Sequence, residues 1–178
     1  MEVNYLNEIK AVEGWALQCY QESLKKTPNI DVIVENLRKI NLEARKIERG
    51  MMTWLKRDQS LIDNYTKKLS DAKKEVEKAL LKRYIPVGDR VDDEERRRQK
   101  EQDWGVDSYE KKLGYMKKQR IVAKRVLERI TQLRATVITV RAIKKDKGLN
   151  NSSKQVIWML SSLSAEARKE IDYHGDFI

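Results

Sequence analysis

Lysine and arginine side chains are concentrated between Tyr109 and Lys147. This segment has thirteen basic residues against three carboxylates, a net charge of +10, which equals the net charge of the whole chain. Residues 1–108 are nearly balanced, with 22 basic and 21 acidic residues. Basic side chains bind phosphates, and each contact releases counterions. A segment with so large an excess of positive charge therefore gives affinity for a polyanion that depends little on the sequence of that polyanion. The chemistry indicated is electrostatic binding of an anionic partner.

The candidate contacts lie on the helix that we predict for this segment. Positions 111, 118, 125 and 129 fall close to one face at heptad-like spacing, and tyrosines interleaved with them could stack on unpaired bases. The alternative is a solvated lysine-rich face, but such faces usually mix charges of both signs, as residues 31–84 do here. The predicted nucleic-acid-binding residues are Lys111, Lys117, Lys118, Lys124, Arg125, Arg129, Lys144 and Lys145, with Tyr115.

A second charged stretch covers residues 91–103, where four acids at 92–95 precede several bases. Acids at the start and bases at the end suit the helix dipole, which favours a short exposed helix. A flexible linker is the equal alternative. Such carboxylates could hold a hard cation, but the neighbouring bases can neutralise them and no EF-hand spacing is present, so no metal is predicted. Local pairing is the simpler role for the arginines. As a second candidate surface, for a protein partner, we take Trp104 with Arg96, Arg97 and Arg98.

Residues that could carry out catalysis are scarce. His174 is the only histidine and Cys19 the only cysteine, so one chain lacks the ligands for a His/Cys zinc site. Any nucleophile–histidine arrangement would have to use His174, which has no motif around it. Neither GxxxxGK[ST] nor GxGxxG occurs. We therefore predict no enzyme activity, no cofactor and no small-molecule substrate.

Long amphipathic helices must position these residues. Apolar residues recur at three- and four-residue steps over about 3–26, which predicts a first helix. Thr27-Pro28-Asn29 then ends this helix. Over 31–84, capped by Asn29 or Asp31, the stripe is expected to pass Asp58, resume at Leu61 and shift by one residue at Ile62. A bend or break is expected at Gly50 or Asp58. The apolar positions before the shift are Leu37, Ile40, Ala44, Ile47, Met51 and Trp54.

The basic segment is also expected to be a helix, capped by Asp107 or Ser108 and running to about Lys147, with a broad apolar face. Gly148 is a natural C-terminal stop. Two short helices are expected after it, one capped by Asn151 or Ser152 and reaching Leu160, the other capped by Ser164 and ending near Tyr173. Trp15, Trp54 and Trp158 are expected in the core.

The predicted fold is all-α: a long antiparallel, coiled-coil-like helical hairpin with a short N-terminal helix and small C-terminal helices. The predicted parts of this single domain are 1–28, a long heptad-patterned helix at 29–85, a charged loop or short helix at 86–107, a basic helix at 108–148 and a helical tail at 149–178. A long apolar stripe needs a partner helix, so self-association or a helical protein partner is expected.

The function expected from these features is non-enzymatic, largely sequence-independent nucleic-acid binding by an oligomeric protein. The alternative is a helical scaffold that binds another protein through its apolar seam. A weaker alternative is peripheral binding to anionic membranes, which a β-branched apolar face without Phe or Trp at its boundary suits poorly. One cysteine and the lack of a signal-peptide pattern or a long apolar run favour a cytoplasmic, intracellular protein without integral membrane segments.

Overall fold

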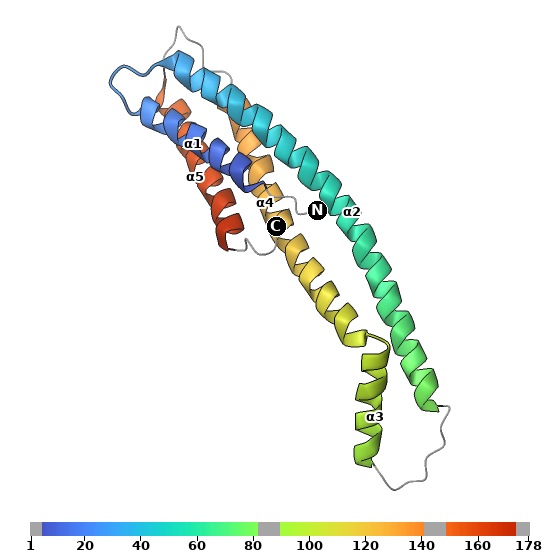
Figure 1. Cartoon of the computed structure of the whole chain (residues 1–178). Coiled ribbons are helices and arrows are strands. Elements are labelled where there is room, and N and C mark those ends of the chain that lie inside the picture. The colour runs from blue at the N-terminus through green and yellow to red at the C-terminus, as the bar shows by residue number, and fades with distance from the viewer. Residues whose placement is uncertain (1–4, 82–89, 141–148, 174–178) are drawn as a thin grey trace. The chain divides into compact units, whose positions relative to one another are not determined.

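The structure is a computed structural model that describes residues 5–81, 90–140 and 149–173. Within them the chain forms five helices and no strand (Figure 1): α1 (Leu6–Ser23), α2 (Ile30–Leu81), α3 (Arg90–Asp103), α4 (Val106–Val140) and α5 (Asn151–Tyr173). The all-α prediction is confirmed, and α2 packs against α4 as the predicted helical hairpin.

Contacts divide the chain into two compact units, each described by itself. The bundle unit comprises residues 1–55 and 119–178, and the hairpin unit comprises residues 56–118. We expect a single domain from the sequence. Both long helices contribute to both units, because α2 begins in the bundle unit and ends in the hairpin unit, and α4 begins in the hairpin unit and ends in the bundle unit.

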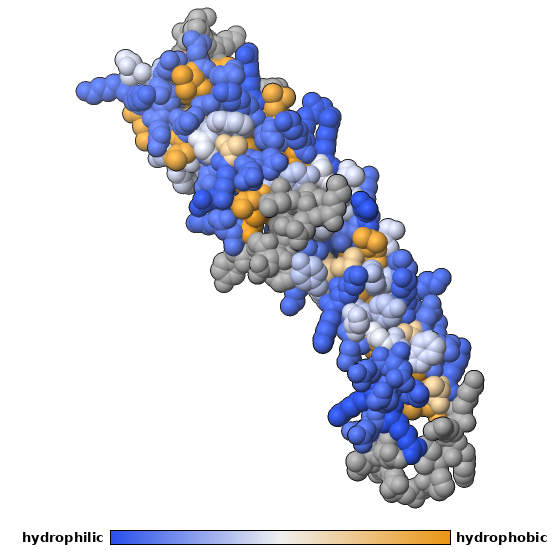
Figure 2. Space-filling view, in the orientation of Figure 1, coloured by the Kyte–Doolittle hydropathy of each residue, from blue (hydrophilic) through white to orange (hydrophobic). Residues whose placement is uncertain are grey.

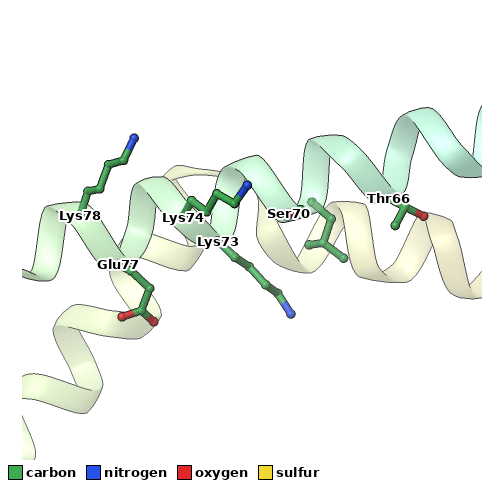
Figure 3. Close-up of a pocket in the computed structure, with 7 residues that line it drawn as sticks. Thr66, Ser70, Lys73, Lys74, Glu77 and Lys78 are labelled. Carbon is green, nitrogen blue, oxygen red and sulfur yellow. The ribbon is translucent and has the colours of Figure 1, made fainter.

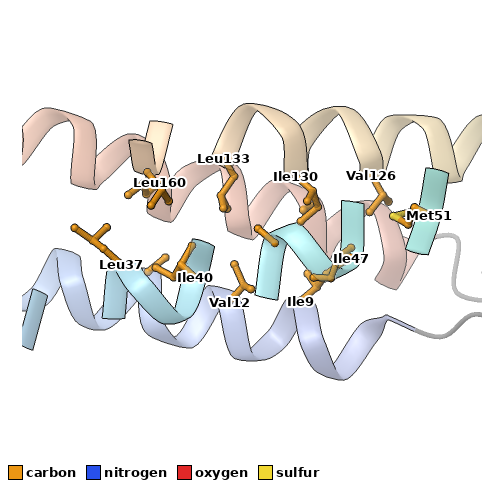
Figure 4. Close-up of a cluster of buried hydrophobic side chains, with 14 of the residues drawn as sticks. Ile9, Val12, Leu37, Ile40, Ile47, Met51, Val126, Ile130, Leu133 and Leu160 are labelled. Carbon is orange, nitrogen blue, oxygen red and sulfur yellow. The ribbon is translucent and has the colours of Figure 1, made fainter. Parts of the chain in front are cut away.

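The core of the bundle unit is built from four helical segments (Figure 4). Each segment contributes side chains at three- and four-residue steps, so one continuous apolar cluster forms where the four stripes meet. α1 and α5 lie side by side. Burying an aliphatic side chain of this size stabilises the folded state by about 1.5–3 kcal/mol. The cluster includes Ile9 and Val12 of α1, Leu37, Ile40 and Ile47 of α2, Val126, Ile130 and Leu133 of α4, and Leu160 of α5.

The apolar stripe of α2 differs in detail from the predicted one. Leu55, Asp58 and Ile62 are buried, whereas Leu61 is 43% exposed and Trp54 is half-buried. The stripe takes two successive four-residue steps, Ile47 to Met51 to Leu55, where strict alternation would give Trp54. This adjustment keeps the stripe on one face of a helix with 3.6 residues per turn. α2 is therefore continuous over 52 residues, so of the bend or break expected at Gly50 or Asp58, no break occurs.

Side-chain caps fix the connection from α1 to α2. Asn29 Oδ1 accepts hydrogen bonds from the backbone N–H groups of Asp31 (3.1 Å) and Val32 (3.3 Å), so Asn29 is the N-cap of α2. Glu22, near the end of α1, accepts the backbone N–H of Asn29 at 2.8 Å and a bond from Lys25 Nζ at 2.5 Å. One carboxylate thus joins the end of α1 to the start of α2.

The C-terminal tail is one helix, not the two short helices that we predicted. α5 runs unbroken from Asn151 to Tyr173, and Asn150 caps it by accepting the Ser153 N–H at 2.7 Å. Ser164 does not begin a helix: it is fully buried, and its hydroxyl donates to the Ser161 carbonyl at 2.9 Å. This bond satisfies the hydroxyl inside the helix, so the serine does not have to act as a cap.

Trp158 lies outside the core, contrary to the prediction. Its neighbour Ile157 and the nearby Leu160 are fully buried, whereas Trp158 is 53% exposed. Successive residues on a helix are 100° apart, so the residue after a core position turns toward solvent. Trp15 and Trp54 are half-buried and pack against the core, as expected.

The hairpin unit is built from the second part of α2, α3 and the first part of α4. Ile62, Leu113 and Met116 form one small core, and Ala72, Val76 and Val106 form another. In each unit the stripe of α2 is buried against other helices of the same chain, and the expected self-association stays a prediction.

Gly105 makes the corner between α3 and α4. It has φ +67°, a left-handed conformation that glycine adopts without steric cost, and its N–H bonds the Gln102 carbonyl at 3.0 Å. Its own carbonyl accepts the Tyr109 N–H at 3.1 Å, so α4 starts at Val106. α4 thus begins just before Asp107 and Ser108, the two residues that we predicted as its cap.

Hydrophilic side chains cover most of the face shown in Figure 2, with small apolar areas between them. Across the described parts of the chain, no helix combines the length and the apolar character needed to span a bilayer.

Candidate nucleic-acid interface

A groove of about 860 Å³ lies at the corner between α3 and α4, within the hairpin unit. Its cationic side chains come from both helices, and one carboxylate, Asp107, is among its lining residues. The groove brings Lys111 and Tyr115, predicted for nucleic acid, together with Arg98, predicted for a protein partner. Its lining comprises Arg98, Gln102, Gly105, Asp107, Ser108, Lys111, Lys112 and Tyr115.

The turn at Gly105 explains why these residues meet. α4 starts at the next residue, so the last turn of α3 and the first turns of α4 have no loop between them. On α4, Lys111, Tyr115 and Lys118 follow at spacings of four and three residues, which places them along one face of the helix. All three are exposed. The ring of Tyr115 is therefore flanked along the helix by two lysines.

The positive charge of this surface is weakly neutralised. Lys111, Lys117 and Lys118 are exposed and form no ion pair within the described residues. Arg98 lies 4.0 Å from Glu94, but both side chains are more than 80% exposed, so solvent screens the pair and its contribution is small. These cations remain available for an external anion.

A second aromatic residue lies beside the same helix. Tyr65 of α2 has the Lys112 ammonium 4.6 Å and the Lys68 ammonium 5.4 Å from its ring centre, and its ring lies 6.2 Å from that of Tyr109. A hydrogen bond from Lys112, helped by the positive charges of Lys112 and Lys68, lowers the pKa of Tyr65. We did not predict Lys112, Lys68 or Tyr65 as site residues, because their proximity depends on the register between α2 and α4.

The basic residues of α4 in the bundle unit are partly neutralised by α5. Arg129 Nε lies 3.1 Å from Glu166, and Arg125 lies 3.8 Å from Glu170. Lys124 is exposed and has no acidic partner in the part of the chain that the structure describes. Lys144 and Lys145, also predicted, lie outside the described residues.

The residues predicted for a protein partner have different surroundings. Arg97 binds Glu77 of α2 and lies 3.4 Å from Glu101, so it joins α3 to α2. Arg96 is half-buried. Trp104, which follows the last residue of α3, is 46% exposed.

A second groove, of about 600 Å³, lies on α2 in the hairpin unit (Figure 3). Its lysines are paired: Lys73 with Glu110 at 2.6 Å, Lys78 with Glu75 at 2.6 Å and Lys74 with Asp71 at 3.9 Å. A carboxylate, Glu77, also lines it. Each of its three lysines has an acid within 4.0 Å and Glu77 adds a carboxylate, whereas Lys111 at the α3–α4 corner has no acidic partner among the described residues, so this groove is a weaker candidate for an anion.

No cluster of histidine, cysteine or acidic side chains within the described ranges could hold a metal ion. Comparison with protein families, with curated proteins and with solved structures finds no match to this chain.

Proposed function

We propose that this chain is a non-enzymatic nucleic-acid-binding protein that contacts phosphates largely without regard to sequence. The observation that carries the proposal is the surface of α4 in the hairpin unit. There Lys111, Lys117 and Lys118 are exposed without an acidic partner among the described residues, beside a groove that Arg98 and Lys112 also line. Lysines held in this way bind phosphates as point charges and give affinity without base readout.

In the bundle unit, Lys124 adds a further exposed cation, and Arg125 and Arg129 could contribute if phosphates displaced their carboxylate partners. Surface ion pairs are worth about 0–1 kcal/mol, so such an exchange costs little. Oligomerisation remains part of the proposal as an independent expectation.

A second candidate function is a scaffold that binds another protein. Trp104 supports it, because an exposed tryptophan is a frequent anchor in protein interfaces. Phosphate binding explains the lysines without an acidic partner among the described residues better than a scaffold role does. Trp104 is a single exposed aromatic residue and does not explain those lysines.

The test is binding of labelled oligonucleotides, followed by fluorescence anisotropy over a salt series. The test variant replaces Lys111, Lys117 and Lys118 with glutamine. The matched control replaces Lys10, Lys26 and Lys169 of the bundle unit, which are also exposed, with glutamine. Both variants lose three positive charges. We expect the slope of log K against log salt to become less negative by about 0.7–0.9 per lost contact in the test variant only.

Equal loss in both variants would show that only the total charge matters. No binding at low salt would overturn the proposal and favour the scaffold. Sedimentation with anionic vesicles in place of oligonucleotide binding would favour the peripheral membrane alternative.

A further inference from the structure

We propose that the groove at the α3–α4 corner is a binding site for an unpaired nucleotide, with the base stacked on Tyr115 and an adjacent phosphate held by Lys111 and Arg98. The hairpin unit would then prefer single-stranded to double-stranded nucleic acid. This inference rests on the proposed function and narrows its substrate class.

Tyr115 is suited to stacking by its position. Its side chain is 44% exposed and lines the groove. Along the axis of α4, Lys111 lies about 6 Å before it and Lys118 about 4.5 Å after it, at about 1.5 Å per residue. A base on the ring would thus have a cation on either side for its neighbouring phosphates. Every base presents a π-face, so such a platform does not require a particular sequence.

The groove adds polar groups around that platform. The lining residues include three cations, Lys111, Lys112 and Arg98, and one carboxylate, Asp107, so the groove has a net positive charge. Gln102 brings a side-chain amide, which can donate to and accept from the edge of an extruded base. A cationic groove with an exposed aromatic ring is the combination that proteins use for single strands.

A duplex could use only part of this arrangement. Its base faces are stacked on one another, so a protein reaches base edges in the grooves and phosphates outside them. The lysines would still bind a duplex, but Tyr115 would contribute little. An acidic peptide would likewise satisfy the cations without using the ring.

The experiment measures binding of the full chain to a fluorescent single strand of mixed sequence and to the matching duplex, at the same salt concentration. DNA and RNA strands form separate arms. The variants are Tyr115→Ala, which removes the ring, and Tyr115→Phe, which keeps the ring and removes the hydroxyl. Circular dichroism confirms that each variant folds, and Tyr109→Phe serves as the control for removing a hydroxyl from the same helix.

We expect Tyr115→Ala to weaken single-strand binding about 10-fold, which corresponds to the lower half of the range for one stacked base. Duplex binding should not change, and Tyr115→Phe should bind single strands like the original chain. Competition by polyglutamate should be weaker than competition by an unlabelled single strand of equal charge.

Three results would overturn the inference while leaving nucleic-acid binding intact. These are equal loss for single strand and duplex in Tyr115→Ala, a loss in Tyr115→Phe as large as in Tyr115→Ala, or polyglutamate competing as well as the single strand. Absence of binding to either oligonucleotide at low salt would overturn the proposed function and this inference together.

Discussion

The side chain of Tyr5 occupies the space beside Gly50 where any other residue would place its β-carbon. A β-carbon at position 50 would lie 1.7 Å from Tyr5 Oη and 2.8 Å from Cζ, closer than atoms can approach. Burial, with a smaller contribution from the charge of Glu8, raises the pKa of the Tyr5 hydroxyl. Gly50 is therefore required for the close approach of Tyr5 to α2, and the helix itself is unbroken there.

Replacing Gly50 with alanine should have opposite effects in two backgrounds. In the original chain, Gly50→Ala must displace the Tyr5 ring, so we expect no gain, or a net loss, in the free energy of unfolding. In a Tyr5→Ala background, the same change should stabilise the protein by about 0.8–1 kcal/mol, the difference in helix propensity. Urea unfolding of the four proteins measures both effects. The same gain in both backgrounds would refute the contact.

Two glycines of the hairpin unit should respond oppositely to alanine. Gly105 has φ +67°, so Gly105→Ala should destabilise by about 1–2 kcal/mol. Gly114 lies inside α4, and a β-carbon there would meet nothing within 4 Å, so Gly114→Ala should stabilise by about 0.5–1 kcal/mol. Thermal unfolding of both variants gives the signs. A stabilised Gly105→Ala would contradict the left-handed corner.

Freeing an arginine from α5 should strengthen nucleic-acid binding if the proposed function is correct. Glu166→Gln removes the carboxylate 3.1 Å from Arg129. One added phosphate contact should make the slope of log K against log salt more negative by about 0.9 for a duplex. Glu128→Gln is the control, because Glu128 is exposed on α4 and forms no ion pair within the described residues. The same change of slope in both variants would mean that binding responds to the net charge of the protein and not to the release of Arg129.

Acid should remove the stabilisation that Glu22 provides. The hydrogen bond from Lys25, followed by the Asn29 N–H, lowers the pKa of the Glu22 carboxyl. A group with a lowered folded-state pKa stabilises the fold above its unfolded pKa, about 4.3 for glutamate, and this stabilisation is lost as pH falls through the folded value. Glu22→Gln should therefore be less stable than the original chain at neutral pH.

The measurement for Glu22 is thermal unfolding of both proteins from neutral pH into the acid range. The difference between them should shrink as the pH falls below about 4. Glu95→Gln, which changes an exposed carboxylate, should track the original chain throughout. A difference that is constant with pH would mean that the charge of Glu22 is not involved.

The helical periodicity was sufficient to predict the fold class and the α2–α4 pairing. Details that depend on packing were harder to predict. Trp54 and Leu61 continue a strict heptad pattern, yet Trp54 is only half-buried and Leu61 is exposed, whereas Leu55 is buried, because a continuous helix keeps its stripe on one face. Ser164 looks like a cap in sequence, but inside a helix its hydroxyl can bond the preceding turn.

The sequence predicts nucleic-acid-binding residues only on the basic helix, and it does not predict that residues of α3 join them. Lys111 and Tyr115 stand out by charge and type, and their grouping with Arg98 required the turn at Gly105. The pairing of Arg125 and Arg129 with acids of α5 could not be foreseen, because it depends on how α5 lies against α4. Charge patterns predict which side chains could bind an anion, and tertiary contacts decide which are already neutralised.

The single thiol of the chain is chemically silent in the folded protein. Cys19 is fully buried, its Sγ–H points to the Ile33 carbonyl at 3.7 Å, and burial raises its pKa to about 12, so almost no thiolate forms near neutral pH. A cysteine introduced on the exposed surface, for example at position 111, would therefore accept a label or a photocrosslinker selectively. The native sequence can thus serve directly as the background for mapping, residue by residue, which positions touch a bound strand.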